Sequence, residues 1–128
     1  MEPRIVGRYA IMDEIASGGM AAVHLGRLLG GAGFARTVAI KRLHPQLARD
    51  PEFVAMLLDE ARLASRIRHP NVVTTLDVVP EADEVLLVME YVVGESLARL
   101  LRAARPGRMP LDVVVAVMSS VLHGLHAA

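Results

Sequence analysis

The chain has 128 residues, a length that normally allows one domain with one hydrophobic core. Its 14 Lys and Arg residues balance 14 Asp and Glu residues, and a formal net charge of zero argues against nucleic acid or an anionic membrane as a partner. The absence of cysteine excludes disulfides and thiolate metal sites, and it fits a reducing compartment.

The N-terminal stretch carries acidic residues and has no apolar segment of the kind that a secretory signal requires. The longest strictly apolar runs, such as residues 113–118, are far too short to span a bilayer. These observations predict a cytoplasmic protein with no membrane segment in this chain. Apolar residues nevertheless make up 53% of the chain, a high proportion for a small soluble domain that needs an explanation.

Alternating apolar residues predict three strands before the first long helix, at residues 8–16, 22–29 and 36–43. In the second of these strands, Val23 and Leu25 fall on one face. Gly18 and Gly19 lie between the first and second strands. The two glycines are therefore expected to lie in a strand–turn–strand unit.

A helix is predicted next, because Asp50 is a good N-cap, Pro51 suits the first helical position, and Pro70 ends the pattern. Its expected apolar stripe consists of Phe53, Met56, Leu57, Leu63, Ala64 and Ile67. Two strands, a short helix and a final helix are expected to follow at residues 71–79, 84–93, 96–104 and 111–128. The final helix has its own apolar stripe of Leu111, Val114, Val115, Met118, Val121, Leu122 and Leu125.

Three phosphate-binding interpretations of Gly18 and Gly19 compete with a purely structural one. A dinucleotide-binding fingerprint needs a helix after its glycines, and here a strand is expected. A Walker A loop needs a lysine within the loop, and this loop has none. In the hairpin lid of protein kinases the lysine comes one strand later, where residues 38–41 (VAIK) supply it. The structural alternative is a glycine turn that only closes a hairpin, and VAIK favours the lid.

Two charged residues occupy positions that are expected to be half-buried. Glu60 lies on the predicted helical stripe, and Lys41 shares a strand face with Ala39, opposite Val38 and Ile40. A carboxylate that faces inward is costly unless it is paired. An ion pair between Lys41 and Glu60 is therefore the favoured hypothesis, and the alternative is that Glu60 lies at the edge of the stripe and reaches water.

These motifs together resemble the protein kinase family, in its bacterial serine/threonine branch, over nearly the whole chain. Residues 15–23 (IASGGMAAV) resemble the glycine-rich loop, VAIK resembles the lysine motif of the third strand, and Glu60 resembles the acid of helix C. Residues 68–73 (RHPNVV) resemble the loop after that helix. Residues 87–97 (LVMEYVVGESL) resemble the fifth strand, the hinge and the first helix of the large lobe.

The resemblance implies an α+β fold, with a small lobe made of an antiparallel five-stranded sheet and helix C, followed by the first helices of an incomplete large lobe. It places the ATP-binding small lobe and hinge at residues 1–92, and the start of the large lobe, with helices D and E, at residues 93–128. It also implies that the chain binds ATP, and that the Mg²⁺ ligands lie beyond the last residue of this chain.

For the phosphate groups, the resemblance implies a catalytic pair in which Glu60 holds Lys41 on the α- and β-phosphates. Gly18 and Gly19 would let backbone amides approach the phosphates, because a Cβ would block that approach. The loop residues expected to contact the nucleotide are Ile15, Ala16, Ser17, Gly18 and Gly19.

For the adenine, the resemblance implies an apolar roof made of Val23 and Ala39. Met89 would be the gatekeeper at the back of the adenine site. The backbone of Glu90 and Val92 would form hydrogen bonds with the edge of the base.

The sequence departs from the family pattern in two ways. Ala16 and Ala21 stand at the first and third glycine positions of the loop, and alanine is tolerable at the third where φ stays negative. Nothing in the chain resembles the His-Arg-Asp catalytic loop or the Asp-Phe-Gly motif, so the chain alone is expected to bind nucleotide without transferring phosphate. The apolar stripe of the final helix would have no remainder of the large lobe to pack against. The helix is therefore expected to be exposed and to self-associate.

Two functions remain open. The first is the ATP-binding part of a protein serine/threonine kinase, which transfers the γ-phosphate of MgATP to an unidentified protein when the rest of the catalytic domain is present. The second is a non-catalytic nucleotide-binding or kinase-interaction module, with the final helix as its interface. Of the other polar residues, His69 and Asn71 are expected to anchor a loop, and no His, Asp or Glu cluster has metal-ligand spacing.

Overall fold

The computed structural model describes residues 2–33, 35–81 and 83–128. The chain divides into two compact units. One contains the residues up to Arg66 together with Thr74–Tyr91, and the other contains Ile67–Val73 and Val92–Ala128. The last point at which the chain passes from one unit to the other, between Tyr91 and Val92, falls beside the expected lobe boundary between residues 92 and 93, whose functional meaning stays a prediction.

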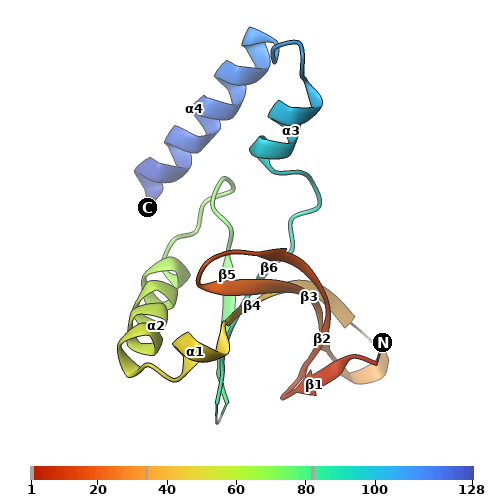
Figure 1. Ribbon diagram of the computed structural model, residues 1–128, viewed down its shortest axis with the longest axis vertical. Helices are drawn as coiled ribbons and strands as arrows, with labels where there is room; N and C mark the ends of the chain where they lie inside the picture. Colours follow the sequence, from red (N-terminus) through yellow and green to blue (C-terminus); the bar gives the residue numbers. More distant parts are fainter. Residues whose placement is uncertain (1, 34, 82) are drawn as a thin grey trace. The chain divides into compact units, whose positions relative to one another are not determined.

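Figure 1 labels the elements of both units. The strands are β1 (Arg4–Val6), β2 (Tyr9–Ser17), β3 (Ala21–Leu29), β4 (Ala35–Leu43), β5 (Thr75–Pro80) and β6 (Val85–Glu90). The helices are α1 (Pro45–Ala48), α2 (Pro51–Ser65), α3 (Leu97–Ala103) and α4 (Leu111–Ala127), and a 3₁₀ turn covers Gly31–Gly33. All five strands and three helices expected from the sequence are present, and β1 and α1 are additional.

In the described residues of the first unit, the strands form a six-stranded antiparallel sheet in the order β1-β2-β3-β4-β6-β5. The sheet therefore has one strand more than the five that were expected. The sequence does not reveal β1, because three residues are too few to show alternation. Gly7 has a φ of 56°, and this left-handed conformation allows the tight turn that pairs Val6 with Tyr9.

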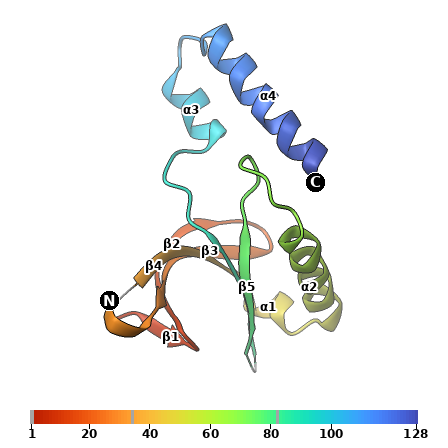
Figure 2. The same ribbon diagram turned by 180° about the vertical axis from the view of Figure 1, so that it is seen from behind.

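The sheet carries two hydrophobic clusters. One contains Val6, Tyr9, Ile11, Val38, Ile40, Leu86 and Val88. The other contains Ala21, Leu43, Leu57, Ala61, Val85 and Leu87, and so includes the buried side of α2. Helix α2 also contacts β5, and it can be followed beside the sheet in Figures 1 and 2. Val38 and Ile40 thus share one face, as predicted, and Lys41 lies on the face of the α2 cluster.

A close approach between β3 and β4 depends on Gly26. A Cβ atom on Gly26 would overlap Cδ1 of Ile40 and would lie 3.1 Å from the carbonyl oxygen of Ala10. Ile40 is fully buried, so its side chain occupies the space that the glycine leaves open. The sequence alone does not indicate this role, because the requirement arises only when the two strands pair.

Helix α2 begins as predicted and ends earlier than predicted. Asp50 accepts a hydrogen bond from the backbone N–H of Glu52 at 3.0 Å, and Pro51 is the first helical residue. The helix ends at Ser65, well before Pro70. A proline sets the latest position at which a helix can end, and it does not prevent the helix from ending earlier.

Helix α2 buries only part of the apolar stripe that the sequence predicts. Its buried residues are Leu57 and Ala61, whereas Met56 is 48% exposed and Leu63 is 64% exposed. Leu57 of the predicted stripe is buried and Phe53 and Ala64 are half-buried. The prediction is therefore confirmed for these residues and wrong for Met56 and Leu63. Apolar residues occupy more than one side of this helix, and packing against the sheet selects among them.

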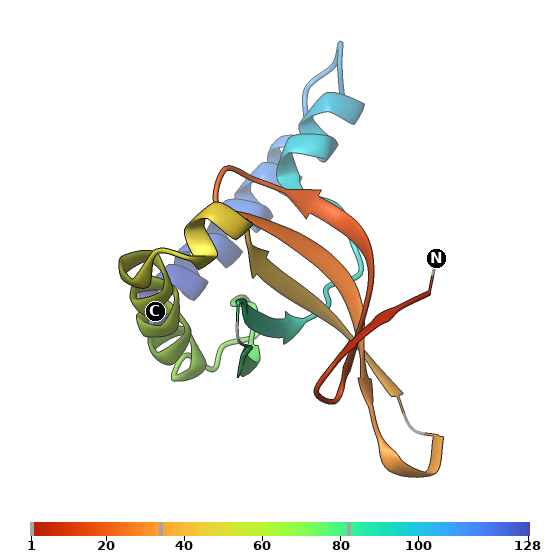
Figure 3. The same cartoon turned by 60° about the horizontal axis from the view of Figure 1, so that its bottom comes forward.

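Side-chain interactions join the two edges of the sheet. Strands β1 and β5 are the edge strands, yet Arg4 Nη2 lies 2.6 Å from Glu84 Oε2 in the turn before β6. Asp77 Oδ2 of β5 accepts hydrogen bonds from Tyr9 Oη at 2.8 Å and from Arg8 Nη2 at 3.2 Å. The sheet is consequently strongly curled, as Figure 3 shows.

These interactions predict that the fold loses stability in acid. Burial on its own raises the pKa of Asp77, but the hydrogen bonds from Tyr9 and Arg8 outweigh it and hold the pKa below its ordinary value. Burial likewise raises the pKa of Glu84. The hydrogen bonds from Arg4 and Arg42 outweigh burial and hold this pKa below its ordinary value. A carboxyl group with a lowered pKa in the folded state stabilises the protein above its unfolded pKa, and this contribution is lost as the pH falls below about 4.

The measurement is urea denaturation of the wild type, Asp77→Asn and Asp59→Asn between about pH 7 and pH 3. We expect Asp77→Asn to be less stable at pH 7 and to lose less stability on acidification than the wild type. Asp59 is 71% exposed, so Asp59→Asn should behave as the wild type does. Parallel pH profiles for Asp77→Asn and the wild type would contradict this account.

In the second unit, residues 67–73 are fixed to α4. Asn71 Nδ2 donates to the carbonyl oxygen of Ser120 at 3.0 Å, and the backbone N–H of Asn71 donates to His69 Nδ1 at 3.0 Å. Gly124 is buried, and a Cβ there would lie 3.0 Å from the carbonyl oxygen of Asn71. The expectation that His69 and Asn71 anchor a loop is confirmed.

The helices of the second unit leave much apolar surface exposed. Helix α3 begins as predicted after Ser96, whose Oγ accepts from the backbone N–H of Arg99 at 3.2 Å. All seven apolar residues of the predicted α4 stripe are exposed, from 38% for Val114 to 77% for Leu111. No helix in the described part of the chain is both long enough and apolar enough to cross a membrane.

Candidate nucleotide-binding site

The register of the sheet brings residues of the predicted nucleotide site together on one face. Val23 of β3 lies opposite Lys41 of β4, which lies opposite Leu87 of β6. In the next row, Ala39 lies opposite Met89. Val23, Ala39, Lys41 and Met89 are thus neighbours in two adjacent rows, although they are far apart in the sequence.

The glycine-rich turn joins β2 to β3 at the end of this face. The backbone N–H of Gly18 donates to the carbonyl oxygen of Ala21 at 2.9 Å, which closes the hairpin. Neither Gly18 nor Gly19 has a positive φ. A Cβ on Gly18 would come no nearer than 3.9 Å to another residue, and one on Gly19 would meet nothing within 4 Å. The hairpin itself does not require glycine here, which favours the interpretation that an external ligand approaches the turn.

The alanines at the other two glycine positions adopt ordinary backbone conformations. Ala16 pairs with Val23, and Ala21 is buried. Among the described residues, Ala32 is the one non-glycine residue with a positive φ, so Ala21 meets the condition under which an alanine is tolerable at the third glycine position. The pairing between β2 and β3 is irregular around Ile15, and this β-bulge bends β2 just before the turn.

Lys41 stands out both in the sequence and in the structure. It is the only lysine of the 128 residues, and the other basic side chains are 13 arginines and 5 histidines. Its side chain is half-buried on the face that it shares with Val23 and Leu87. A lysine is a compact point charge on a flexible stem and binds phosphate in that form, whereas an arginine binds as a planar fork.

Glu60 differs from its prediction. The residue is exposed, and in the described part of the chain no ion pair joins it to Lys41. The predicted burial of Glu60 is wrong, because α2 turns Leu57 and Ala61 toward the sheet. The edge position with access to water, the alternative considered from the sequence, describes Glu60 in this structure. Its role beside Lys41 stays a prediction.

Glu60→Ala is expected to change the free energy of unfolding by less than about 0.5 kcal/mol, because the side chain is exposed and forms no ion pair with any described residue. Asp59→Ala is the matched control on the neighbouring position of the same helix. Urea denaturation of both variants tests this expectation. A loss of about 3 kcal/mol in Glu60→Ala alone would indicate a desolvated ion pair.

The predicted hinge residues are placed differently from one another. The backbone N–H of Glu90 donates to the carbonyl oxygen of Thr74 at 3.0 Å, and Glu90 Oε1 accepts from the backbone N–H of Thr74 at 2.8 Å. The N–H of Glu90 is therefore committed within the protein, and the contact of the Glu90 backbone with adenine stays a prediction. Val92 is 61% exposed and belongs to the second unit.

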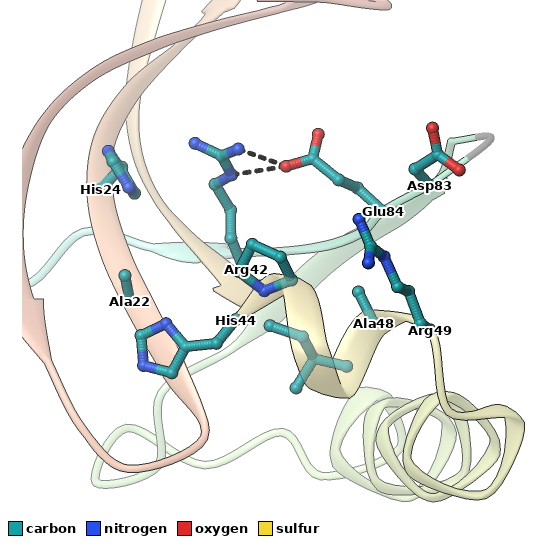
Figure 4. Close-up of a pocket in the computed structure, with 10 residues that line it drawn as sticks. Ala22, His24, Arg42, His44, Ala48, Arg49, Asp83 and Glu84 are labelled. Carbon is teal, nitrogen blue, oxygen red and sulfur yellow. Dashed lines mark hydrogen bonds and ion pairs between the residues drawn. The ribbon is translucent and has the colours of Figure 1, made fainter.

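A cavity of about 410 Å³ lies on the opposite face of β3 and β4 and is shown in Figure 4. Ala22, His24 and Arg42 line it, and these residues alternate with Val23 and Lys41 along their strands. Arg42 Nε donates to Glu84 Oε1 at 3.0 Å in this cavity. The cavity is thus separate from the predicted nucleotide face.

The sequence does not reveal one contact of the glycine-rich turn. His44, directly after β4, has its Nε2 atom 2.8 Å from the carbonyl oxygen of Gly18. A separation of 26 residues and the absence of a motif around His44 explain why only the structure shows this contact. In the described part of the chain, no group of three His, Cys, Asp or Glu residues is placed to hold a metal ion.

Comparison with known proteins identifies the family. The protein kinase domain family matches residues 9–128. "Tyrosine-protein kinase MasK" of Myxococcus xanthus is 42% identical over 95% of this chain and 19% of its own length. "Serine/threonine-protein kinase PrkC" of Bacillus subtilis is 38% identical over 94% of this chain and 18% of its own length. The crystal structure of the Mycobacterium tuberculosis PknI kinase domain matches with a TM-score of 0.80 at 24% identity, covering 99% of this chain and 50% of that chain.

The chain belongs to the protein kinase family. The similarity to PknI confirms the fold, a curled antiparallel sheet with helices as in the small lobe of a kinase and the first helices after it. The chain spans about a fifth of the length of the curated relatives it matches and half of the solved kinase domain. The resemblance inferred from the sequence motifs is thereby confirmed.

Proposed function

We propose that this chain is the ATP-binding part of a protein kinase that transfers the γ-phosphate of MgATP to serine or threonine residues of a protein substrate. The observation that carries this proposal is the position of Lys41. The only lysine of the chain lies half-buried on the sheet face that also presents Val23, Ala39 and Met89.

The described residues divide the binding of a nucleotide between them. The apolar side chains of Val23 and Ala39 suit the flat face of adenine, and the ammonium group of Lys41 suits the α- and β-phosphates. Gly18 and Gly19 leave their amides open to close approach. Mg²⁺ neutralises charge on the phosphates when bound, and the remaining catalytic groups belong to parts of a kinase domain that this chain does not cover. The cytoplasm, which supplies ATP, is the proposed location.

The proposed acceptor residue follows from the names of the relatives. PrkC is a serine/threonine-protein kinase, and so is "Serine/threonine-protein kinase PknB" of Mycobacterium leprae, which is 33% identical over 97% of this chain. MasK is a tyrosine-protein kinase at 42% identity. We favour serine and threonine as acceptors because most of these relatives are named serine/threonine-protein kinases.

A second function has an observation in its favour. The exposed apolar stripe of α4 is the kind of surface that a protein-binding module presents. In that case the chain would bind a partner kinase or sense nucleotide without catalysis, and α4 would also be the surface through which copies of the chain associate.

The test is incubation of the natural full-length protein with MgATP labelled at the γ-phosphate and a general protein substrate, followed by phosphoamino-acid analysis. We expect labelled phosphoserine or phosphothreonine. Phosphotyrosine alone would contradict the proposed acceptor. Tight binding of ATP with no transfer would support a non-catalytic module that senses nucleotide. No binding of ATP would contradict the kinase function and the nucleotide-sensing form of the second function.

A further inference from the structure

His44 fixes the glycine-rich turn at two points. Its backbone N–H donates to the carbonyl oxygen of Met20 at 3.0 Å, and its ring atom Nε2 lies 2.8 Å from the carbonyl oxygen of Gly18. Because a carbonyl oxygen only accepts, Nε2 is the donor. Figure 4 shows the His44 ring turned toward the β2–β3 hairpin. Two carbonyl groups on either side of Gly19 are thus tied to one residue.

The backbone of His44 is itself held in place. Pro45 follows His44, and a proline restricts the residue before it to extended conformations, which the φ of −59° and ψ of 146° at His44 satisfy. The carbonyl oxygen of His44 accepts from the backbone N–H groups of Leu47 at 2.9 Å and Ala48 at 3.0 Å. The short helix α1 therefore provides a rigid base from which the imidazole reaches the turn.

The direction of one amide follows from this contact. In a planar trans peptide, the carbonyl group of Gly18 and the N–H of Gly19 point in opposite directions. The Gly18 carbonyl points to His44, which lines the cavity of Figure 4 together with Ala22 and Arg42. The N–H of Gly19 must then point away from His44, and among the described residues it makes no backbone hydrogen bond.

We propose that His44 is a positioning residue that orients the Gly18–Gly19 peptide so that the Gly19 amide is presented to a nucleotide phosphate. This inference rests on the proposed function of the chain in ATP binding. His44 acts through the turn and does not touch the nucleotide. Without its imidazole the peptide can rotate, and the amide is available for only part of the time.

The proposal predicts an effect on phosphate binding and none on base binding. In the natural full-length protein, His44→Ala should weaken the binding of ATP about fivefold, the equivalent of one hydrogen bond, and leave the binding of adenosine unchanged. His44→Gln carries an amide donor at a similar reach and should restore most of the affinity for ATP. A loss of folding would instead weaken the binding of both ligands.

His24→Ala is the matched control. His24 belongs to β3 of the same hairpin. Its ring atom Nδ1 lies 2.9 Å from the carbonyl oxygen of Met12 in β2, away from the glycine-rich turn. We expect the ratio of ATP affinity to adenosine affinity in His24→Ala to equal that of the wild type. Calorimetric titration of each variant with ATP and with adenosine measures the ratio.

Hydrogen exchange without nucleotide separates this inference from the proposed function. His44→Ala should speed the exchange of the Gly18 amide, whose hydrogen bond to Ala21 closes the turn, and His24→Ala should not. Unchanged exchange at the turn, or an unchanged ratio of affinities, would overturn the role of His44. Faster exchange in a protein that binds neither ATP nor adenosine would support the fixed turn and contradict the proposed function instead.

Discussion

Lys41→Met in the natural full-length protein is expected to lower the rate of phosphoryl transfer about 100-fold or more. The substitution keeps a flexible side chain of similar length on the face shared with Val23 and Leu87, but it removes the positive charge. Preorganised charges at a transferring phosphoryl group contribute effects of about this size in enzymes. Steady-state kinetics with MgATP and a protein substrate measure the change.

Arg36→Met is the matched control for the loss of a positive charge. Arg36 is an exposed residue of the same strand, and it pairs with Leu28 at the end of β4 away from Lys41. Its substitution should leave the rate of transfer within about twofold of the wild type, because exposed charges contribute little. Equal activity of Lys41→Met and Arg36→Met would contradict the role assigned to Lys41.

Ile40→Ala is expected to lower the free energy of unfolding by about 2–5 kcal/mol. Ile40 is fully buried in the cluster with Val38 and Leu86. Its Cδ1 atom fills the space above Gly26, where no neighbouring Cβ can move in to fill a cavity. Urea denaturation followed by circular dichroism gives the change in free energy.

Ile5→Ala removes the same atoms from a residue that is 57% exposed on the edge strand β1. Its cost should be below about 1 kcal/mol, because little buried surface is lost. A cost for Ile40→Ala as small as that for Ile5→Ala would mean that the sheet packs differently from the arrangement described.

The elements that the sequence predicts correctly are those with strong local causes. Strands β3 and β4 alternate clearly, and α2 and α3 begin at residues whose side chains cap them, Asp50 and Ser96. Strand β1 and helix α1 are missed because they contain three and four residues, too few to show a period. Short elements of this kind are fixed by their surroundings.

The site shows the same division between local and distant causes. The order of the glycine-rich turn, VAIK and the hinge is visible in the sequence, and strand pairing then brings Lys41, Val23 and Ala39 together. The exposure of Glu60 could not be predicted, because α2 has apolar residues on several sides and packing against the sheet determines which side is buried. The contact between His44 and Gly18 depends on the fold as a whole.

The composition also has a physical explanation in the structure. Apolar residues make up 53% of the chain, and the exposed stripe of α4 accounts for part of this proportion. Each of its side chains would contribute roughly 1.5–3 kcal/mol if it were fully buried. Self-association through α4 is therefore an expected property of the chain in isolation, and it stays a prediction.

Covalent labelling of Lys41 by an acyl-phosphate derivative of ATP tests the central claim most directly. Such a reagent transfers its acyl group to a lysine amine beside the bound phosphates and releases ATP. This chain contains a single lysine, so mass spectrometry of its peptides distinguishes a label on Lys41 from one on the N-terminal amine. We predict rapid acylation of Lys41 in the folded protein that excess ATP suppresses. Acylation of Lys41 that is absent, or that excess ATP leaves unchanged, would contradict the assignment of this face as the nucleotide site.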